Sequence, residues 1–383
     1  SELGIQVVNP QTLKVTLEAP TPYFLGLTAF PTYLPVHQKS VAENANWAAE
    51  AKTIVANGPF TITSWAHDQE LTLEKNPHYW DAANVQLEKV TMVMVPDENT
   101  ALTEFSNQNF DINDRIPPAD LPNLLAGGKA TKEPMLGTYY YLFNTTRTPF
   151  NDPRVRKAFT MAINRQTLID AVVRGGQEPA FAYVPPGIPD PVSGRDFRDE
   201  GGDYFTENVD QAKQLLDEAG QQSPKPFTLI YNESESHKAI AEAIGEMWRT
   251  SLGIPQIQFE QQEWDVFIDT RRNLDYDVAR GGWIGDYLDP MTFIDMWTTG
   301  SGNNNTGWSN ASYDKLVSEI RSSADQTVRM QKMHAAEGIL MDEMPILPIY
   351  YYVQLFQQQP WVQGVFRTAQ GTVDFKWAHV EPQ

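Results

Sequence analysis

The sequence predicts an α/β fold with a parallel or mixed sheet, because strand-like and helix-like segments alternate in its second half. Residues 227–231 (FTLIY) form an apolar run typical of a buried strand, and 237–252 (HKAIAEAIGEMWRTSL) carries apolar residues at helical spacing. A second strand-like segment begins at Ile254, a short helix is expected after Trp264, and 276–283 (YDVARGGW) is strand-like again. Ligands of such sheets gather beyond the carboxyl ends of the strands.

The first half of the chain contains shorter elements. Alternating or apolar runs predict strands at 12–18, 60–64, 71–75 and 89–95, and helical spacing predicts helices at 98–107, at 118–126 and, late in the chain, at about 325–342. A proline-rich loop is expected from Pro20 to Pro35, and WAHDQE suits a hairpin connection between the second and third strands.

Local signals mark the ends of two further helices. Asp152 and Pro153 favour a helix start in 151–164 (NDPRVRKAFTMAIN), since aspartate caps free amide groups and proline suits the first helical position. Gly220 favours the end of the helix at 210–220 (DQAKQLLDEAG), because glycine is common just beyond a helix.

The composition indicates a soluble globular protein with room for two or three domains. The chain has 383 residues, of which 41% are hydrophobic and 20% are charged. Its formal net charge of −20 argues against nucleic acid or an anionic membrane as a partner, because both bind basic patches. The lack of cysteine excludes disulfides and thiolate chemistry. It fits an exported bacterial protein, and equally some cytosolic ones.

Two uncharged stretches, 19–38 and 345–366, approach the length of a membrane span. Each contains several prolines, which would break a spanning helix, so neither is expected to cross a membrane. No signal peptide is visible, and the chain enters the alternating segment LKVTLEAP almost at once. We therefore expect that the beginning of the natural protein is missing from this sequence.

Catalytic and metal-binding motifs are scarce. The six histidines are scattered without HExxH or other paired spacing, so neither a metal nor a cofactor is expected. No GxSxG, P-loop or GxGxxG motif occurs. SYDK at 312–315 matches the SxxK pattern of acyl-serine enzymes, but no SDN or KTG accompanies it, and we interpret it as a helix start.

The segment 281–290 (GGWIGDYLDP) is the main candidate for a functional site. Asp286 and Asp289 could be the carboxylate pair of a glycosidase, but the Asp–Pro step favours a turn or capping role for Asp289. Arg280 precedes Asp286 along the same strand. The two could hold the two ends of a zwitterion, or each could form an internal salt bridge. The residues alone leave both possibilities open.

Longer segments point to a family. RGGWIGDYLDPMTF resembles the corresponding part of the oligopeptide-binding proteins, the extracytoplasmic receptors of peptide ABC importers. Further matches occur in the same order in NGPFTITSW, LEKNPHYWD, YYYLFNTTRTPFNDPRVRKAFTMAINRQTLI, EPAFAYVPPGIP, LIYNESESHK, EWDVFIDTR and ILPIYYYVQ. The similarity spans nearly the whole chain. Family members carry a long additional N-terminal portion, which this resemblance implies is absent here.

The resemblance implies a fold of two α/β lobes of the periplasmic-binding-protein type (class II, cluster C), with mixed sheets, a hinge and the ligand enclosed between the lobes. It assigns four segments: 1–36 to a remnant of a small extra domain, 37–137 to part of the first lobe, 138–352 to the second lobe, and 353–383 to the return to the first lobe. The crossings between the lobes are expected near Thr138 and Tyr352.

The resemblance also implies how the two ends of a peptide would be bound. Asp286 would receive the peptide's α-ammonium group. The residues that would meet the peptide's carboxylate, depending on its length, are Arg280, Arg271 and His237.

Side-chain pockets and backbone contacts follow from the same comparison. Gly282 and Ile284 would offer backbone groups to an extended peptide, and Trp283 would line a neighbouring pocket. The expected pocket walls are Trp264, Tyr140 and Tyr352. Leu142 stands where some relatives carry a glutamate that meets basic ligand side chains, so this site is expected to prefer less basic peptides.

Together these implications predict a receptor without catalysis that captures short oligopeptides and delivers them to the membrane permease of an ABC importer. It would be extracytoplasmic, either periplasmic or a cell-surface lipoprotein. The alternatives are a receptor of this class for a non-peptide ligand, a peptide-pheromone signalling receptor, and a hydrolase using Asp286 and Asp289. A missing N-terminal fragment or a second copy of the truncated chain would be a further partner.

Overall fold

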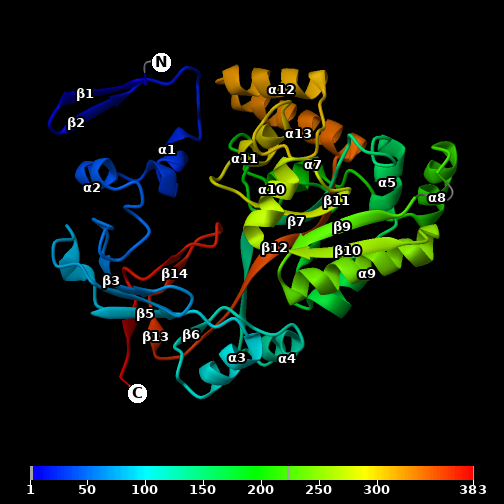
Figure 1. The fold of residues 1–383 in the computed structure, drawn as a ribbon. Helices are drawn as coiled ribbons and strands as arrows, with labels where there is room; N and C mark the ends of the chain where they lie inside the picture. Colours follow the sequence, from blue (N-terminus) through cyan, green and yellow to red (C-terminus); the bar gives the residue numbers. More distant parts are fainter. Residues whose placement is uncertain (1–2, 222–224, 383) are drawn as a thin grey trace. The chain divides into compact units, whose positions relative to one another are not determined.

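The computed structural model describes residues 3–221 and 225–382 and has the predicted α/β fold with a mixed sheet. The chain divides into two compact units. Unit 1 comprises Ser1–Thr28 and Leu136–Tyr352, and unit 2 comprises Ala29–Met135 and Val353–Gln383. Two strands continue from one unit into the other along the chain, β7 (Thr131–Phe143) and β12 (Ile346–Gln358) (Figure 1).

Unit 1 contains most of the helices. These are α1 (Phe24–Leu27), α5 (Pro153–Met161), α6 (Arg165–Leu168), α7 (Phe197–Gly201), α8 (Val209–Glu218), α9 (Glu235–Leu252), α10 (Trp264–Arg272), α11 (Met291–Ile294), α12 (Ala311–Ser322) and α13 (Gln326–Glu343). A π-helical turn (Ile169–Val173) follows α6, and a 3-10 turn (Asp295–Trp297) follows α11. Besides β7 and β12, its strands are β1 (Ile5–Asn9), β2 (Thr12–Val15), β8 (Glu178–Pro179), β9 (Phe227–Asn232), β10 (Ile257–Gln262) and β11 (Val278–Ile284).

The main sheet of unit 1 has the strand order β10-β9-β11-β7-β12, with β8 paired to β12. Strand β9 is parallel to β10 and β11, whereas β7 is antiparallel to β11. The register between β11 and β7 places Arg280 opposite Tyr141 and Gly282 opposite Tyr139. Because side chains alternate between the two faces of a strand, these four residues share one face of the sheet.

Helices cover both faces of this sheet, as Figure 1 shows, and each face has its own core. On one face, α5, α8 and α9 pack against Tyr139, Tyr141 and Phe143. On the other, α10 to α13 pack against Tyr140 and Leu142. The run YYYLF is apolar throughout because alternate residues of a strand that is covered on both faces enter both cores.

Local signals fix helix ends much as predicted. The Asp152 carboxylate accepts a hydrogen bond of 2.9 Å from the backbone N–H of Arg154 at the start of α5. Gly220 lies beyond α8 with a φ of 67°, a conformation that costs glycine little. The helix that starts after Asp152 ends at Met161, and Asn164 caps the separate helix α6.

The first residues of the chain also belong to unit 1. The predicted strand at 12–18 ends at Val15 and pairs antiparallel with β1, which the sequence analysis did not anticipate. Tyr23, just before α1, stacks on Tyr287 with ring centroids 4.6 Å apart and planes 9° apart. This contact joins the segment around Tyr23 to the core beneath α10 to α13.

Unit 2 is built from short elements. These are α2 (Gln38–Glu43), β3 (Phe60–Ala66), β4 (Glu70–Lys75), β5 (Lys89–Val93), α3 (Glu98–Ser106), β6 (Ile112–Asn113), α4 (Leu121–Ala126), β13 (Val362–Gln363), β14 (Phe366–Arg367), β15 (Val373–Asp374) and β16 (His379–Val380), with 3-10 turns at Pro31–Tyr33 and Ala82–Asn84. The predicted strands β3, β4 and β5 form an antiparallel sheet, and β6 pairs with the last residues of β12. A small core gathers Ile116, Leu121 and Ala130. Within residues 3–221 and 225–382, no helix is long and apolar enough to cross a membrane.

Candidate functional site

The turn after β11 carries Asp286 on a rigid support. The N–H of Gly285 donates to the carbonyl of Leu136 at 2.8 Å, and the N–H of Asp286 donates to the Thr292 hydroxyl at 3.0 Å. Among the described residues, the Asp286 carboxylate has neither a hydrogen-bond donor nor a cationic partner, and partial burial alone raises its pKa. Asp286 is therefore a half-buried carboxylate on a hydrogen-bonded backbone, and no counter-ion accompanies it in the described part of the chain.

Asp289 has a structural role in the same turn. Its carboxylate accepts two hydrogen bonds from one guanidinium nitrogen of Arg329, at 3.0 and 3.1 Å, and one from the N–H of Met291 at 3.0 Å. It is only 7% exposed. The predicted turn or capping role is confirmed, and the Asp286/Asp289 pair does not provide two free carboxylates for hydrolysis.

Arg280 is the second charged group on this part of the sheet. Its Nη2 donates to the Tyr352 hydroxyl at 2.9 Å, and its guanidinium carbon lies 4.9 Å from the centroid of the Tyr139 ring. Its Nε is buried without a hydrogen-bond partner. No carboxylate pairs with Arg280 in the part of the chain that the structure describes, so this cation is held by neutral aromatic groups.

His237 lies at the beginning of α9, beside the same aromatic group. Its Nδ1 is 3.2 Å from the Tyr139 hydroxyl, and the N–H of His237 donates to the capping residue Ser234. Burial, aided by the charge of Arg280, lowers the pKa of His237 to about 3. The imidazole is thus neutral at physiological pH, and it can donate or accept a hydrogen bond without adding charge.

Arg271 supplies another cation without a carboxylate partner among the described residues. It projects from α10 with its guanidinium carbon 5.4 Å from the Phe267 ring centroid, and its Nε is buried without a partner. Burial lowers the pKa of Arg271, and the charge of Arg280 contributes in the same direction. Two guanidinium groups that influence each other and lack acids form a region suited to an anion.

Glycines let these groups approach the strand. A Cβ at Gly282 would clash with the Tyr352 hydroxyl and come within 3.2 Å of the Arg280 guanidinium. A Cβ at Gly281 would enter the Tyr140 ring on the opposite face. The adjacent glycines therefore allow side chains to pack closely against the backbone on both faces of β11.

The remaining predicted residues differ in how accessible they are. Ile284 is 39% exposed and Trp264, at the start of α10, is 52% exposed. Trp283 is partly buried against the core of α10 to α13, with its indole N–H lacking a partner. Tyr140 is 1% exposed and contacts Tyr183 and Trp297 edge to face, so the structure places it in the core beneath β11. Leu142 is fully buried beside it.

Some groups at the site were not singled out by the sequence analysis. Tyr139 lies under the Arg280 guanidinium. The sequence shows that side chains along the strand YYY alternate between its two faces, but it does not show which of the tyrosines share a face with Arg280. The side-chain oxygens of Asn232 and Gln262 lie buried at the carboxyl ends of β9 and β10, and no described residue donates a hydrogen bond to them. Their position follows from the parallel pairing of these strands, which places the two residues opposite each other.

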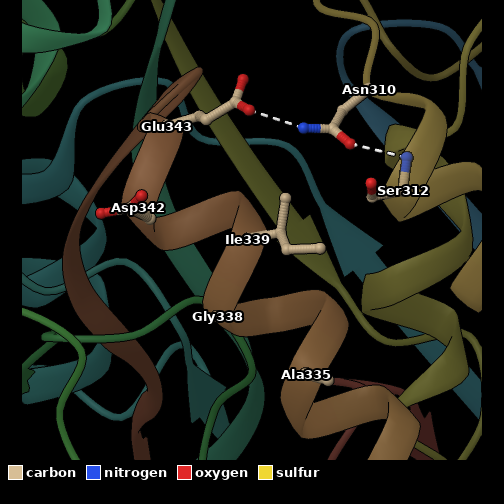
Figure 2. A pocket seen from close by; sticks show the side chains of 7 residues that line it. All are labelled: Asn310, Ser312, Ala335, Gly338, Ile339, Asp342 and Glu343. Carbon is tan, nitrogen blue, oxygen red and sulfur yellow. Dashed lines mark hydrogen bonds between the residues drawn. The ribbon is translucent and has the colours of Figure 1, made fainter.

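A shallow pocket elsewhere in unit 1 has a structural explanation. It lies between the start of α12 and the last turns of α13, and Figure 2 shows Asn310 bridging the two. The Asn310 amide donates to Glu343 at 2.5 Å, and its oxygen caps α12 by accepting from the N–H of Ser312 at 2.9 Å. The pocket contains none of the predicted binding residues. Within residues 3–221 and 225–382, no group of acidic and histidine side chains is arranged to hold a metal.

Known proteins resemble this chain in both sequence and fold. The family model "bacterial extracellular solute-binding proteins, family 5 middle" matches residues 1–305. The chain is 38% identical over 382 residues to the dipeptide-binding protein DppE of Bacillus subtilis, covering 98% of this chain and 70% of DppE. It is also 38% identical over 393 residues to the oligopeptide-binding protein OppA of B. subtilis, covering 99% of this chain and 71% of OppA. The solved structure of Listeria monocytogenes OppA bound to peptide matches with a TM-score of 0.89 at 28% identity, over 99% of this chain and 75% of that one.

Proposed function

Because the chain belongs to the bacterial extracellular solute-binding proteins of family 5, we propose that unit 1 binds short peptides by their two charged ends. Peptides are the solutes named for DppE and OppA, and the L. monocytogenes OppA structure contains one. The charged groups of unit 1 suit the same class of ligand.

The observation that carries this proposal is that the described part of unit 1 contains an unpaired carboxylate and, at other positions, unpaired guanidinium groups. Asp286 is a carboxylate without a cation, whereas Arg280 and Arg271 are cations without carboxylates among the described residues. A group buried in this way costs free energy unless a ligand supplies the missing charge. A peptide has an ammonium group at one end and a carboxylate at the other, so one molecule satisfies both.

The backbone of β11 supports an extended ligand between these charges. Strand β9 pairs with β11 only at Val278 and Ala279, whereas β7 pairs with it from Val278 to Ile284. Residues 280–284 therefore retain one edge without a strand partner among the described strands. Backbone groups of Gly282 and Ile284 on this edge can bond to a peptide main chain, which gives affinity independent of the peptide's sequence.

The function that follows is capture and delivery without catalysis. Asp289 is occupied by Arg329 and a helix end, which leaves Asp286 without the second free carboxylate that a glycosidase needs. The protein acts outside the cytoplasm and transfers its peptide to the membrane permease of an ABC importer. Arg280, Arg271 and the neutral His237 receive the carboxylate according to peptide length, while Trp264, Trp283 and Tyr352 contact side chains.

Calorimetric titration with trialanine, N-acetyl-trialanine and trialanine amide tests this function. Trialanine is expected to bind saturably, and blocking either end should weaken binding by more than about tenfold, because each block removes a charge-assisted interaction. NMR of the peptide after incubation should show no cleavage. Equal affinity for the three compounds, or a cleaved product, would contradict the proposal.

A further inference from the structure

Three carboxylates, Asp286, Asp289 and Asp295, lie around the turn after β11, and they differ in whether an arginine pairs with them. Asp289 is paired with Arg329 at 3.0 Å, and Asp295 is paired with Arg321 at 3.5 Å. The charges of Asp286 and Asp289 both help to raise the pKa of Asp295, so the three interact. Of these three, Asp286 alone has no arginine partner among the residues that the structure describes. The two ion pairs thus reduce the local negative charge while leaving one carboxylate for a ligand.

The pair Asp289–Arg329 is also connected to Asp286 through two stacked tyrosines. The Arg329 guanidinium lies 5.5 Å from the centroid of the Tyr23 ring, and Tyr23 stacks on Tyr287, the residue that follows Asp286. Arg329 comes from α13 and is 1% exposed, so it is held on its own side by the core. Tyr23 comes from a distant part of the sequence, and its stacking on the Tyr287 ring holds the turn against that segment.

We propose that Arg329, Asp289 and Tyr23 are positioning residues that hold the Asp286 carboxylate in place for the ammonium group of a peptide. The inference rests on the proposed function, since it concerns the same ligand. An ion pair with a buried carboxylate depends steeply on geometry, so a small displacement of the turn removes much of its strength. Asp289 belongs to the turn, and Arg329 and Tyr23 contact it, so their effect on peptide binding is confined to recognition of the amino terminus.

Because only recognition of the amino terminus should change, one binding ratio distinguishes a positioning role from a general structural defect. The quantity is the ratio of dissociation constants for N-acetyl-trialanine and trialanine, measured by calorimetry on each folded variant. The wild-type ratio is expected to exceed about 100, which corresponds to about 2.7 kcal/mol at 25 °C. In Tyr23→Ala and Arg329→Lys the ratio should fall by at least about tenfold, while the affinity for the acetylated peptide changes by less than about twofold.

A matched pair of variants separates positioning from packing. Tyr23→Phe retains the stacked ring and is expected to restore most of the ratio that Tyr23→Ala loses. Tyr204 is the control, because it lies 5.3 Å from Arg198 of another buried ion pair, Arg198–Glu337, away from the Asp286 turn. Tyr204→Ala should lower thermal stability and leave the ratio unchanged. Circular dichroism identifies folded variants, and Arg329→Lys carries the test if Tyr23→Ala does not fold.

The outcomes distinguish this inference from the function on which it rests. If Asp286→Ala lowers the ratio toward 1 but Tyr23→Ala and Arg329→Lys keep the wild-type ratio, the positioning role is wrong and the peptide site stands. If Asp286→Ala itself keeps the wild-type ratio, the proposed recognition of the ammonium group fails first. A ratio that falls equally in Tyr204→Ala would also overturn the positioning role.

Discussion

The Arg280 guanidinium donates a hydrogen bond of 2.9 Å to the Tyr352 hydroxyl, and Tyr352 is the last residue of unit 1 before the chain enters unit 2. A neutral phenol orients this cation without neutralising it. The cation therefore retains its charge for a ligand, whereas a carboxylate at the same place would have consumed it.

Arg280→Met should weaken binding of those peptides whose carboxylate reaches this position. Methionine keeps an apolar stem of similar length but removes the charge, so the expected loss is about 2–5 kcal/mol for the free carboxylate. Affinity for the corresponding peptide amide should change little. Arg272→Met is the matched control, because Arg272 is exposed and forms only a surface pair with Asp269. Calorimetry over peptides of two to five residues identifies the length concerned, and an unchanged affinity at every length contradicts this role.

Asp286→Asn should make the unliganded protein more stable at neutral pH. Burial raises the pKa of Asp286 above its unfolded value, so the folded state binds more protons than the unfolded state as pH rises between these two pKa values. Stability falls over that window, and the ionised group opposes folding above it.

Asp289→Asn should act in the opposite direction, because it breaks the buried pair with Arg329, at a cost of about 3–5 kcal/mol. Thermal melts at pH 7 and pH 4 compare the two, and a lower melting temperature for Asp286→Asn at pH 7 counts against an unpaired carboxylate.

Peptide affinity should decrease at both acidic and alkaline pH. As pH falls through the raised pKa of Asp286, the carboxylate is protonated and loses its attraction for the ammonium group, so affinity decreases. Because binding favours the ionised form, the complex releases protons in this window. At the other limit, affinity decreases as the peptide's α-amino group loses its proton, at about pH 8. Calorimetry in buffers of different ionisation enthalpy measures the released protons, and acid weakening should be absent from Asp286→Asn.

His237 should remain neutral across the physiological range. Burial and the charge of Arg280 lower its pKa to about 3, so its ring resonances should not shift between pH 5 and 8 in the unliganded protein. NMR of labelled histidine measures this directly. A His237 titration near pH 6.5 would show that its surroundings are more open than the structure indicates.

Short-range chemistry in the sequence predicted much of the fold. Asp152 and Gly220 mark helix ends through contacts within a few residues, and strand and helix periodicity located β9, α9, β10 and β11. Asp289 was expected to have a capping or turn role because it precedes a proline, and in the structure its carboxylate accepts from the N–H of Met291 within the turn. These features depend on neighbouring residues, so a single sequence contains the information.

Long-range contacts were outside the reach of such reasoning. Arg329 and Asp289 are 40 positions apart, and Tyr23 is still farther from Tyr287, so no local pattern links them. The sequence does not distinguish among the three tyrosines of YYY as site residues. The register of β7 with β11 places Tyr139 beside Arg280 and Tyr140 in the core on the opposite face. The residues alone made Asp286 a candidate, and the resemblance to the peptide-binding family gave it the role of receiving the α-ammonium group. The structure adds the absence of a competing cation within the described residues.

A binding cycle that combines Asp286→Ala with acetylation of the peptide tests the central claim most directly. Four dissociation constants are needed, for trialanine and N-acetyl-trialanine with wild-type protein and with the variant. We expect Asp286→Ala to weaken trialanine binding by about 3–5 kcal/mol, over a hundredfold, and barely to affect the acetylated peptide, because no ammonium group remains to be lost. Equal effects on both peptides, or no effect on either, would show that Asp286 does not receive the amino terminus.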